Sequence, residues 1–181
     1  MRNQFAFQDS PELFGIFGMK VYDVRNGKRI CVRRVLKKNQ ITNQGRRALL
    51  ELMRPVTFGV NQTIRQIFSL SVGTNSTPPT INDDDATMAQ VWRNELVLSE
   101  CEVVATAPNL FLLQIGKILP ETDAVGQVLT EAGIFTRGTL ADPYTSADRW
   151  LYARQTHPPI TKTITMLIEY NWKLGVSIQG A

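Results

Sequence analysis

The residues with reactive side chains are few and lie far apart in the sequence. The chain has one histidine, His157, which Pro158 follows directly, and two cysteines, Cys31 and Cys101, neither of which has a partner at CxxC spacing. A catalytic triad or a histidine metal site needs several such groups within reach of one another. We therefore predict no catalytic residue. We expect His157 to be a loop residue beside a rigid turn, and both cysteines to be buried free thiols.

Carboxylates could support two other kinds of chemistry. The run Asp83–Asp85 lacks the spacing and the glycine of a calcium loop, so we expect it to precede a short helix that ends near Arg93. Glu100 and Glu102 could act as an acid–base pair, but they lie in an alternating segment that places them at a surface or an interface. The sequence contains no Walker loop and no GxGxxG fingerprint. We predict no metal, no cofactor and no enzymatic activity.

Composition indicates one globular domain. The chain has 181 residues, of which 43% are hydrophobic and 20% are charged, a balance that is neither disordered nor membrane-spanning. No apolar run approaches the ~20 residues that a transmembrane helix needs. The N-terminal residues include no apolar stretch, so no signal peptide is expected.

Charge is unevenly distributed along the chain. The net charge is +4, but residues 1–54 hold 12 Lys/Arg against 4 Asp/Glu, whereas residues 55–181 hold 8 against 12. A basic part and an acidic remainder attract another copy of the chain or a neighbouring protein. Four cations could also contact phosphates, but no interleaved aromatic residue or binding motif accompanies them, so nucleic acid is not an expected partner. These cations, expected on a solvated face or at a protein interface, are Arg33, Arg34, Lys37 and Lys38.

The spacing of apolar residues predicts a mainly β fold. Asn26-Gly27 is a strong hairpin signal, because both central residues of that turn need positive φ. Thr42 or Asn43 can cap a helix that Pro55 closes. Further strands are expected at about 68–72, 95–105, 109–118, 127–136 and 149–155. Together these elements predict an antiparallel β-sandwich or barrel-like domain with one or two short helices.

The clearest strand pattern lies at the end of the sequence. Every second residue from Ile164 to Ile178 is apolar, eight in all, which predicts one long half-buried strand over residues 162–178. We expect any bend or bulge in this strand to lie at Gly175.

The first residues are expected to differ from the rest. We predict that residues 1–15 form an arm and that residues 16–181 form a single β-rich domain. The arm contains three phenylalanines that we expect to dock on a neighbouring subunit, Phe5, Phe7 and Phe14. The alternative is that the arm forms the first strand of the sandwich.

Several segments, in the same order along the chain, resemble motifs of a family of small virion structural proteins of tailed bacteriophages. ITNQGRRALL resembles the family's IxNxGxxxL, LSVGTNSTPPT its VGTGTTAP loop, WRNEL its LxNE segment, LTEAGIF its ISEAGLF, and LYARQTHPPITKT its LxARxxFPPIxKT. In this sequence the segments are Ile41–Leu50, Leu70–Thr80, Trp92–Leu96, Leu129–Phe135 and Leu151–Thr163. The sequence departs from the family at His157, where an aromatic residue is more usual.

The resemblance implies a non-enzymatic virion protein, a tail- or neck-associated connector or fibre-anchoring component. Its partners would be other virion proteins and copies of itself in a homo-oligomer, with no membrane. It would lie in the tail, collar or neck region after assembly in the host cytoplasm. The alternatives are a capsid decoration (cement) protein and a nucleic-acid or carbohydrate-binding module.

Overall fold

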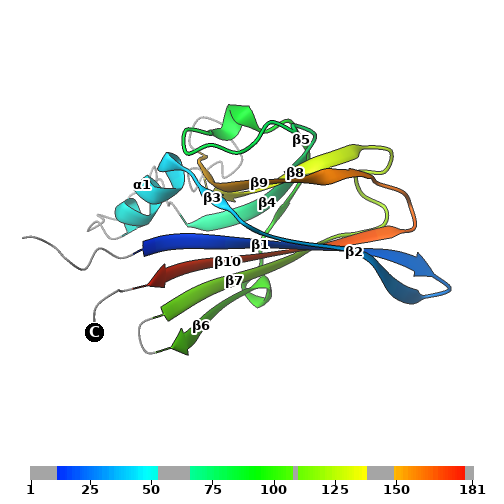
Figure 1. Ribbon diagram of the computed structural model, residues 1–181, viewed down its shortest axis with the longest axis horizontal. Helices are drawn as coiled ribbons and strands as arrows, with labels where there is room; N and C mark the ends of the chain where they lie inside the picture. The colour runs from blue at the N-terminus through cyan, green and yellow to red at the C-terminus, as the bar shows by residue number, and fades with distance from the viewer. Residues whose placement is uncertain (1–11, 53–65, 108–109, 138–148, 178–181) are drawn as a thin grey trace, which may run out of the picture.

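The structure is a computed structural model that describes residues 12–52, 66–107, 110–137 and 149–177. These residues form two antiparallel sheets of five strands each, with the hydrophobic core between them (Figure 1). They also form one α-helix and two short 3-10 helices. The predicted antiparallel β-sandwich is therefore confirmed.

The two sheets are named A and B here, and each is given in spatial order. Sheet A consists of β2 (Lys28–Lys38), β1 (Glu12–Arg25), β10 (Met166–Ser177), β7 (Leu110–Leu119) and β6 (Cys101–Ala107). Sheet B consists of β3 (Gln40–Ile41), β9 (Leu151–Thr161), β8 (Val128–Thr136), β4 (Ile67–Gly73) and β5 (Gln90–Glu95). The helices are α1 (Asn43–Leu52), η1 (Asp85–Thr87) and η2 (Leu98–Glu100).

The hairpin between β1 and β2 forms where the sequence predicts it. Asn26 and Gly27 have φ of 50° and 72°, the left-handed conformation that matches the twist of the flanking strands. Met19 and Val21 of β1 are buried against sheet B, while nearly all of β2 is exposed. The hairpin extends past the rest of the sandwich (Figure 1).

The last four residues of the predicted arm belong to a strand. β1 begins at Glu12, so residues 12–15 belong to sheet A, while residues 1–11, with Phe5 and Phe7, lie outside the described residues. Phe14 pairs with Gly175 across β1 and β10. A Cβ added to Gly175 would lie 2.2 Å from Phe14 Cζ. The ring therefore fills the space above a glycine of its own sheet, and this contact extends the strand.

The alternation predicted for the last strand is confirmed over most of its length. The side chains of Ile168, Tyr170 and Trp172 are 0% exposed. The prediction was wrong at its start, because β10 begins only at Met166 and Ile164 lies before it in a turn, 67% exposed. Pairing on both sides of Gly175 continues without a register shift, so the strand has no bulge there.

The acidic run Asp83–Asp85 leads into a strand, and the predicted helix to Arg93 was wrong. The side chain of Asp84 accepts a hydrogen bond from Thr87 N and so caps a single 3-10 turn, η1. The chain then pairs with β4 as β5. The strand predicted over 95–105 begins only at Cys101, because η2 precedes it.

Helix α1 and segment 74–89 both pack against sheet B. Ala48 of α1 belongs to the core between the sheets, while segment 74–89 covers the outer face of sheet B, which points away from that core. The helix α1 starts where Thr42 Oγ1 accepts a hydrogen bond from Gly45 N at 3.0 Å, as the predicted cap requires. A Cβ on Gly45 would lie 2.2 Å from Tyr152 O, so the helix backbone rests directly on β9. The segment 74–89 packs as closely on β8, with Met88 Sδ where a Cβ of Gly133 would be.

Candidate functional site

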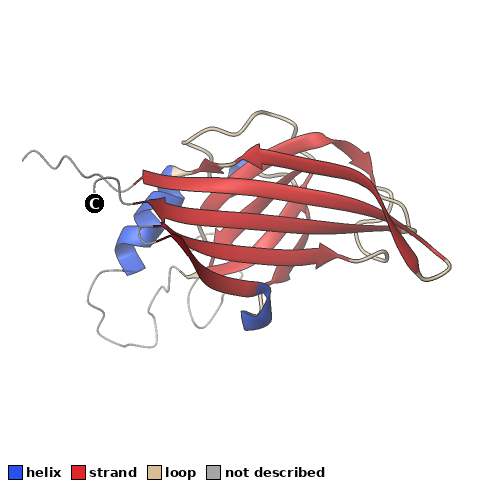
Figure 2. Cartoon of the chain, turned by 60° about the horizontal axis from the view of Figure 1, so that its bottom comes forward, coloured by secondary structure: helices blue, strands red, loops and turns tan. Residues whose placement is uncertain are grey.

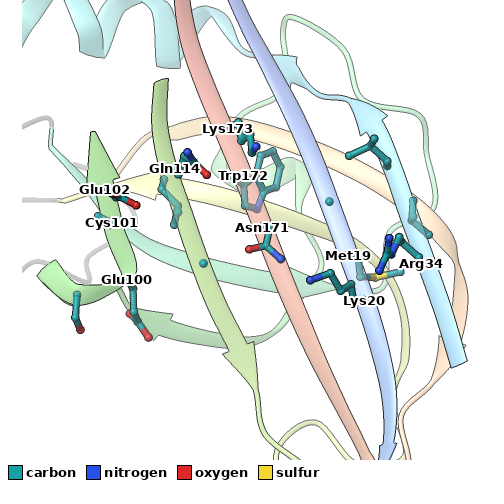
Figure 3. A pocket seen from close by; sticks show the side chains of 16 residues that line it. Met19, Lys20, Arg34, Glu100, Cys101, Glu102, Gln114, Asn171, Trp172 and Lys173 are labelled. Carbon is teal, nitrogen blue, oxygen red and sulfur yellow. The ribbon is translucent and has the colours of Figure 1, made fainter. Parts of the chain in front are cut away.

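The outer face of sheet A contains a groove of about 560 Å³. No described helix lies across this face, which Figure 2 views from outside. The groove reaches across the strands from β2 to β6, and we call it the sheet A groove. Lys20 and Arg34 line it on the β2 side, and Glu100 and Glu102 line it on the β6 side (Figure 3).

Two glycines form the floor of the groove. In the paired strands, Gly18 of β1 lies beside Asn171 of β10, which lies beside Gly116 of β7. Neither glycine has a positive φ. A Cβ on Gly18 would meet its nearest atom at 3.6 Å, and a Cβ on Gly116 would do so at 3.4 Å, which is ordinary van der Waals contact. Neither the backbone conformation nor the packing of the described chain therefore requires glycine at these positions.

Glycine within a strand weakens the strand, and it often marks a point where a ligand or another backbone approaches closely. Because no described atom lies closer than 3.4 Å to the Cβ positions of Gly18 and Gly116, the chain leaves room there for something outside it. The two glycines and Asn171 are the residues that sequence reasoning missed. The available signal was a glycine inside an alternating pattern, as at Phe17-Gly18-Met19.

A hydrogen-bond network fixes the position of Asn171. Its Nδ2 donates to Glu169 Oε1 at 2.8 Å, and Glu169 also accepts from Lys20 Nζ at 3.1 Å and from Tyr22 OH at 3.0 Å. Burial alone would raise the pKa of Glu169, but these three hydrogen bonds outweigh it and hold the pKa below its usual value. The orientation leaves Asn171 Oδ1 over Gly116, where it accepts no hydrogen bond from the described residues.

A second polar cluster lies under the segment that covers sheet B. Arg154 of β9, 0% exposed, donates to Glu131 Oε2 and to Asp83 Oδ2, both at 2.8 Å. The same guanidinium donates to Thr77 O at 3.0 Å, while Glu131 Oε1 accepts from Asn75 N at 3.0 Å. Every charged group of the cluster is paired, so the cluster holds segment 74–89 on the sheet.

The three consecutive aspartates have separate structural partners. Asp83 binds Arg154, Asp84 caps η1, and Asp85 pairs with Arg149. Burial would raise the pKa of Asp83, but hydrogen bonds from Thr80 and Arg154 lower it overall. Within the described ranges, no group of three or more His, Cys, Asp or Glu side chains could hold a metal ion.

The interpretation of His157 as a loop residue was wrong. His157 lies in β9, is 5% exposed, and stacks on Phe17 with the two rings 4° from parallel. Its Nδ1 donates to Pro158 O at 3.0 Å, and burial lowers its pKa to about 4. The Pro158-Pro159 pair suggested a turn, but both prolines lie within β9 with their rings exposed.

The two cysteines are free, as predicted, but they are less buried than expected. Cys31 is exposed because β2 is an edge strand, and Cys101 is half-buried at the start of β6. Burial, together with the charge of Glu100, raises the pKa of the Cys101 thiol. A thiol with a raised pKa is a poor nucleophile at neutral pH.

The structure separates the four cations that were expected at an interface. Arg33 and Lys37 point toward sheet B, where they donate at 3.1 Å to Pro159 O and Thr156 O of β9. Arg34 lines the sheet A groove. Lys38 is exposed at the end of β2, where the chain crosses to sheet B.

Comparisons with protein-family models, curated proteins and solved structures find no match to this chain. Among the described residues, no helix has the length and apolar character needed to cross a membrane.

Proposed function

We propose that the protein is a non-enzymatic structural component of a tailed-phage virion, a tail- or neck-associated connector or fibre-anchoring protein that assembles through protein contacts. The observation that carries this proposal is the floor of the sheet A groove. Gly18 and Gly116 weaken their strands and serve no described part of the chain, so their space fits close approach by a partner.

The segments that resemble virion proteins give independent support, because their residues meet in space. Gly45 of the first segment lies against Tyr152 of the last. Arg154, also from the last segment, binds Glu131 of the segment Leu129–Phe135, and the pair holds the residues that follow β4. The resembling residues thus act as supports of the fold, as the motifs of a structural family would.

The groove is better suited to docking than to covalent chemistry. The thiol that lines it, Cys101, has a raised pKa, and the one histidine is buried on Phe17 in the core. The charged groups at its two ends have opposite signs, which favours a polar or charged protein surface as the partner.

The proposal is tested by filling the groove in the phage that encodes the chain. Gly18→Val and Gly116→Val add side chains at positions where a Cβ makes only ordinary van der Waals contacts, and valine favours a strand, so the melting temperature should stay the same or rise. Incorporation into purified particles, measured by quantitative mass spectrometry, should fall at least tenfold. Thr161→Val, exposed at the end of β9 in sheet B, is the matched control.

Absence of the wild-type chain from purified particles would refute the virion proposal. Normal incorporation of both groove variants would refute the role of the groove. Labelling of the chain in particles distinguishes the tail or neck from the capsid surface, where a decoration protein would lie.

A further inference from the structure

Sheet A has two long edges that no described strand covers. β2 has 11 residues and β6 has 7, whereas the edge strands of sheet B, β3 and β5, have 2 and 6. An uncovered edge strand presents a row of N–H and C=O groups that can pair with another strand. Proteins usually shorten, charge or cover such edges, so the composition of these two is informative.

Both edges carry exposed apolar side chains. The three most exposed large hydrophobic residues of the described chain are Leu98 at 89%, Leu36 at 74% and Val103 at 74%. Leu36 lies in β2, Val103 lies in β6, and Leu98 lies in η2 directly before β6. An edge that is protected only against aggregation would carry charged side chains and no exposed apolar ones. The exposed apolar residues therefore indicate that these edges become buried against another protein surface.

The two edges carry opposite charges. Residues 28–38 contain six Lys/Arg and no Asp/Glu, while residues 98–107, which form η2 and β6, contain Glu100 and Glu102 and no Lys/Arg. Glu100 also pairs with Lys117 of β7 at 2.9 Å. Pairing of β2 with β2, or of β6 with β6, would place like charges opposite one another, which is destabilising. Pairing of β2 with β6 places cations beside carboxylates.

The strand order determines the direction of such a contact. All four pairings in sheet A are antiparallel, and the sheet has five strands, so β2 and β6 run in the same direction. Copies related by a repeated rotation would therefore join β2 to β6 as parallel neighbours. Such a contact uses two different surfaces of the chain, and it closes into a ring or continues as a filament.

We infer that copies of this chain assemble head to tail, with β2 of one copy paired to β6 of the next. This inference rests on the proposal that the protein works by protein contacts, and it names a second copy as the partner at these edges. The sheet A groove, which opens on the outer face and not at the edge backbone, stays available to a different chain.

The first experiment exchanges the charges of the two edges. Lys28→Glu, Arg29→Glu, Arg34→Glu and Lys38→Glu together change the charge of residues 28–38 from +6 to −2, and Glu102→Lys with Val103→Lys changes that of residues 98–107 from −2 to +1. Each of the two edge variants alone should associate at least tenfold more weakly than the wild type in sedimentation velocity. An equimolar mixture should recover assembly, because each reversed edge then meets a complementary one. Arg46→Glu, exposed on α1, is the control for a charge reversal outside the two edges and should behave as the wild type.

The second experiment does not depend on charge. Cys31 is exposed on β2, so Val103→Cys on β6 provides a thiol on the opposite edge. A short bis-maleimide cross-linker should give a ladder of covalent oligomers, and Cys31→Ser should abolish the ladder.

A wild-type chain that stays monomeric up to about 1 mM would overturn head-to-tail pairing. So would folded edge variants that do not assemble when they are mixed. A ladder of cross-linked oligomers that persists in the Cys31→Ser variant would overturn it as well. A monomeric chain that is nevertheless present in particles would refute the edge contact while leaving the proposed function intact.

Discussion

The outer faces of the two sheets use glycine for opposite purposes. On sheet B, a Cβ on Gly73 would lie 2.3 Å from Glu131 Oε1, and one on Gly133 would lie 2.4 Å from Met88 Sδ, so the chain itself occupies the space that glycine leaves. On sheet A, a Cβ on Gly18 or Gly116 would come no closer than 3.6 Å and 3.4 Å to its nearest atom, so the chain leaves room for one. The fold therefore needs glycine at the two positions in sheet B, whereas in sheet A only a partner could need it. Substitution at these positions tests this difference.

The largest effect is expected in the buried cluster of sheet B. Arg154→Leu leaves Glu131 and Asp83, both buried, without their cationic partner. Breaking a buried pair from one side should lower the free energy of unfolding by about 3–5 kcal/mol. Chemical denaturation of the purified chain measures this, and a loss under 1 kcal/mol would show that the cluster does not hold segment 74–89.

The glycines themselves give the second test. On sheet B, Gly73→Ala forces a Cβ to within 2.3 Å of Glu131 Oε1 and 2.6 Å of Ala89 O, and such overpacking should cost about 1–3 kcal/mol. Gly18→Ala fits without strain and should stabilise the chain by about 0.4–1 kcal/mol, because alanine restricts the unfolded chain more than glycine does. An equal loss of unfolding free energy at both positions would contradict the proposed difference between the outer faces of the two sheets.

The contact between the sheets should depend on pH through His157. Its pKa falls from 6.5 to about 4 on folding, so between these values the unfolded chain binds the proton and the folded chain does not. Stability should therefore fall as pH decreases from about 6.5 toward 4, by about 2 kcal/mol at pH 5 from this group. His157→Phe removes this contribution. The free energy of unfolding of the variant should therefore rise relative to that of the wild type as the pH decreases from 7 to 5. If the difference in unfolding free energy between the variant and the wild type does not change with pH, the imidazole of His157 is not buried in its neutral form.

The smallest effect is expected at the ion pair on the outer face of sheet A. Lys20 and Glu169 are only partly buried, and pairs of this kind contribute about 0.2–1 kcal/mol. Lys20→Ala should therefore change the denaturation midpoint little, and the change should shrink further in high salt. A loss comparable to that of Arg154→Leu would mean that sheet A is as tightly held as sheet B.

Local patterns in the sequence predicted the elements well. The Asn26-Gly27 hairpin, the Thr42 cap and the alternation from Ile168 to Leu174 each depend on neighbours within a few residues, and each is confirmed. The sequence reasoning failed where a strand contains prolines, as at His157, and where an acidic run precedes a strand, as before β5.

The sheet A groove could not be predicted in the same way. Gly18, Gly116 and Asn171 become neighbours only through the register of three strands that lie far apart in the sequence. Of the residues named in advance as partner contacts, Arg34 lines the groove, while Arg33 and Lys37 bind β9 instead. Their alternation along β2 separates them, but the side that faces sheet B could be known only from the fold.

The pairing of β1 with β10 has a consequence for biosynthesis. Glu12 pairs with Ser177, so the centre of sheet A joins strands that the ribosome makes at widely separated times. Until residues 166–177 emerge, the apolar face of β1, including Phe17, Met19 and Val21, has no neighbouring β10 to complete its sheet. Such non-local pairing slows folding and leaves nascent chains prone to aggregation. Ribosome stalling just before β10 should therefore increase chaperone association with the nascent chain.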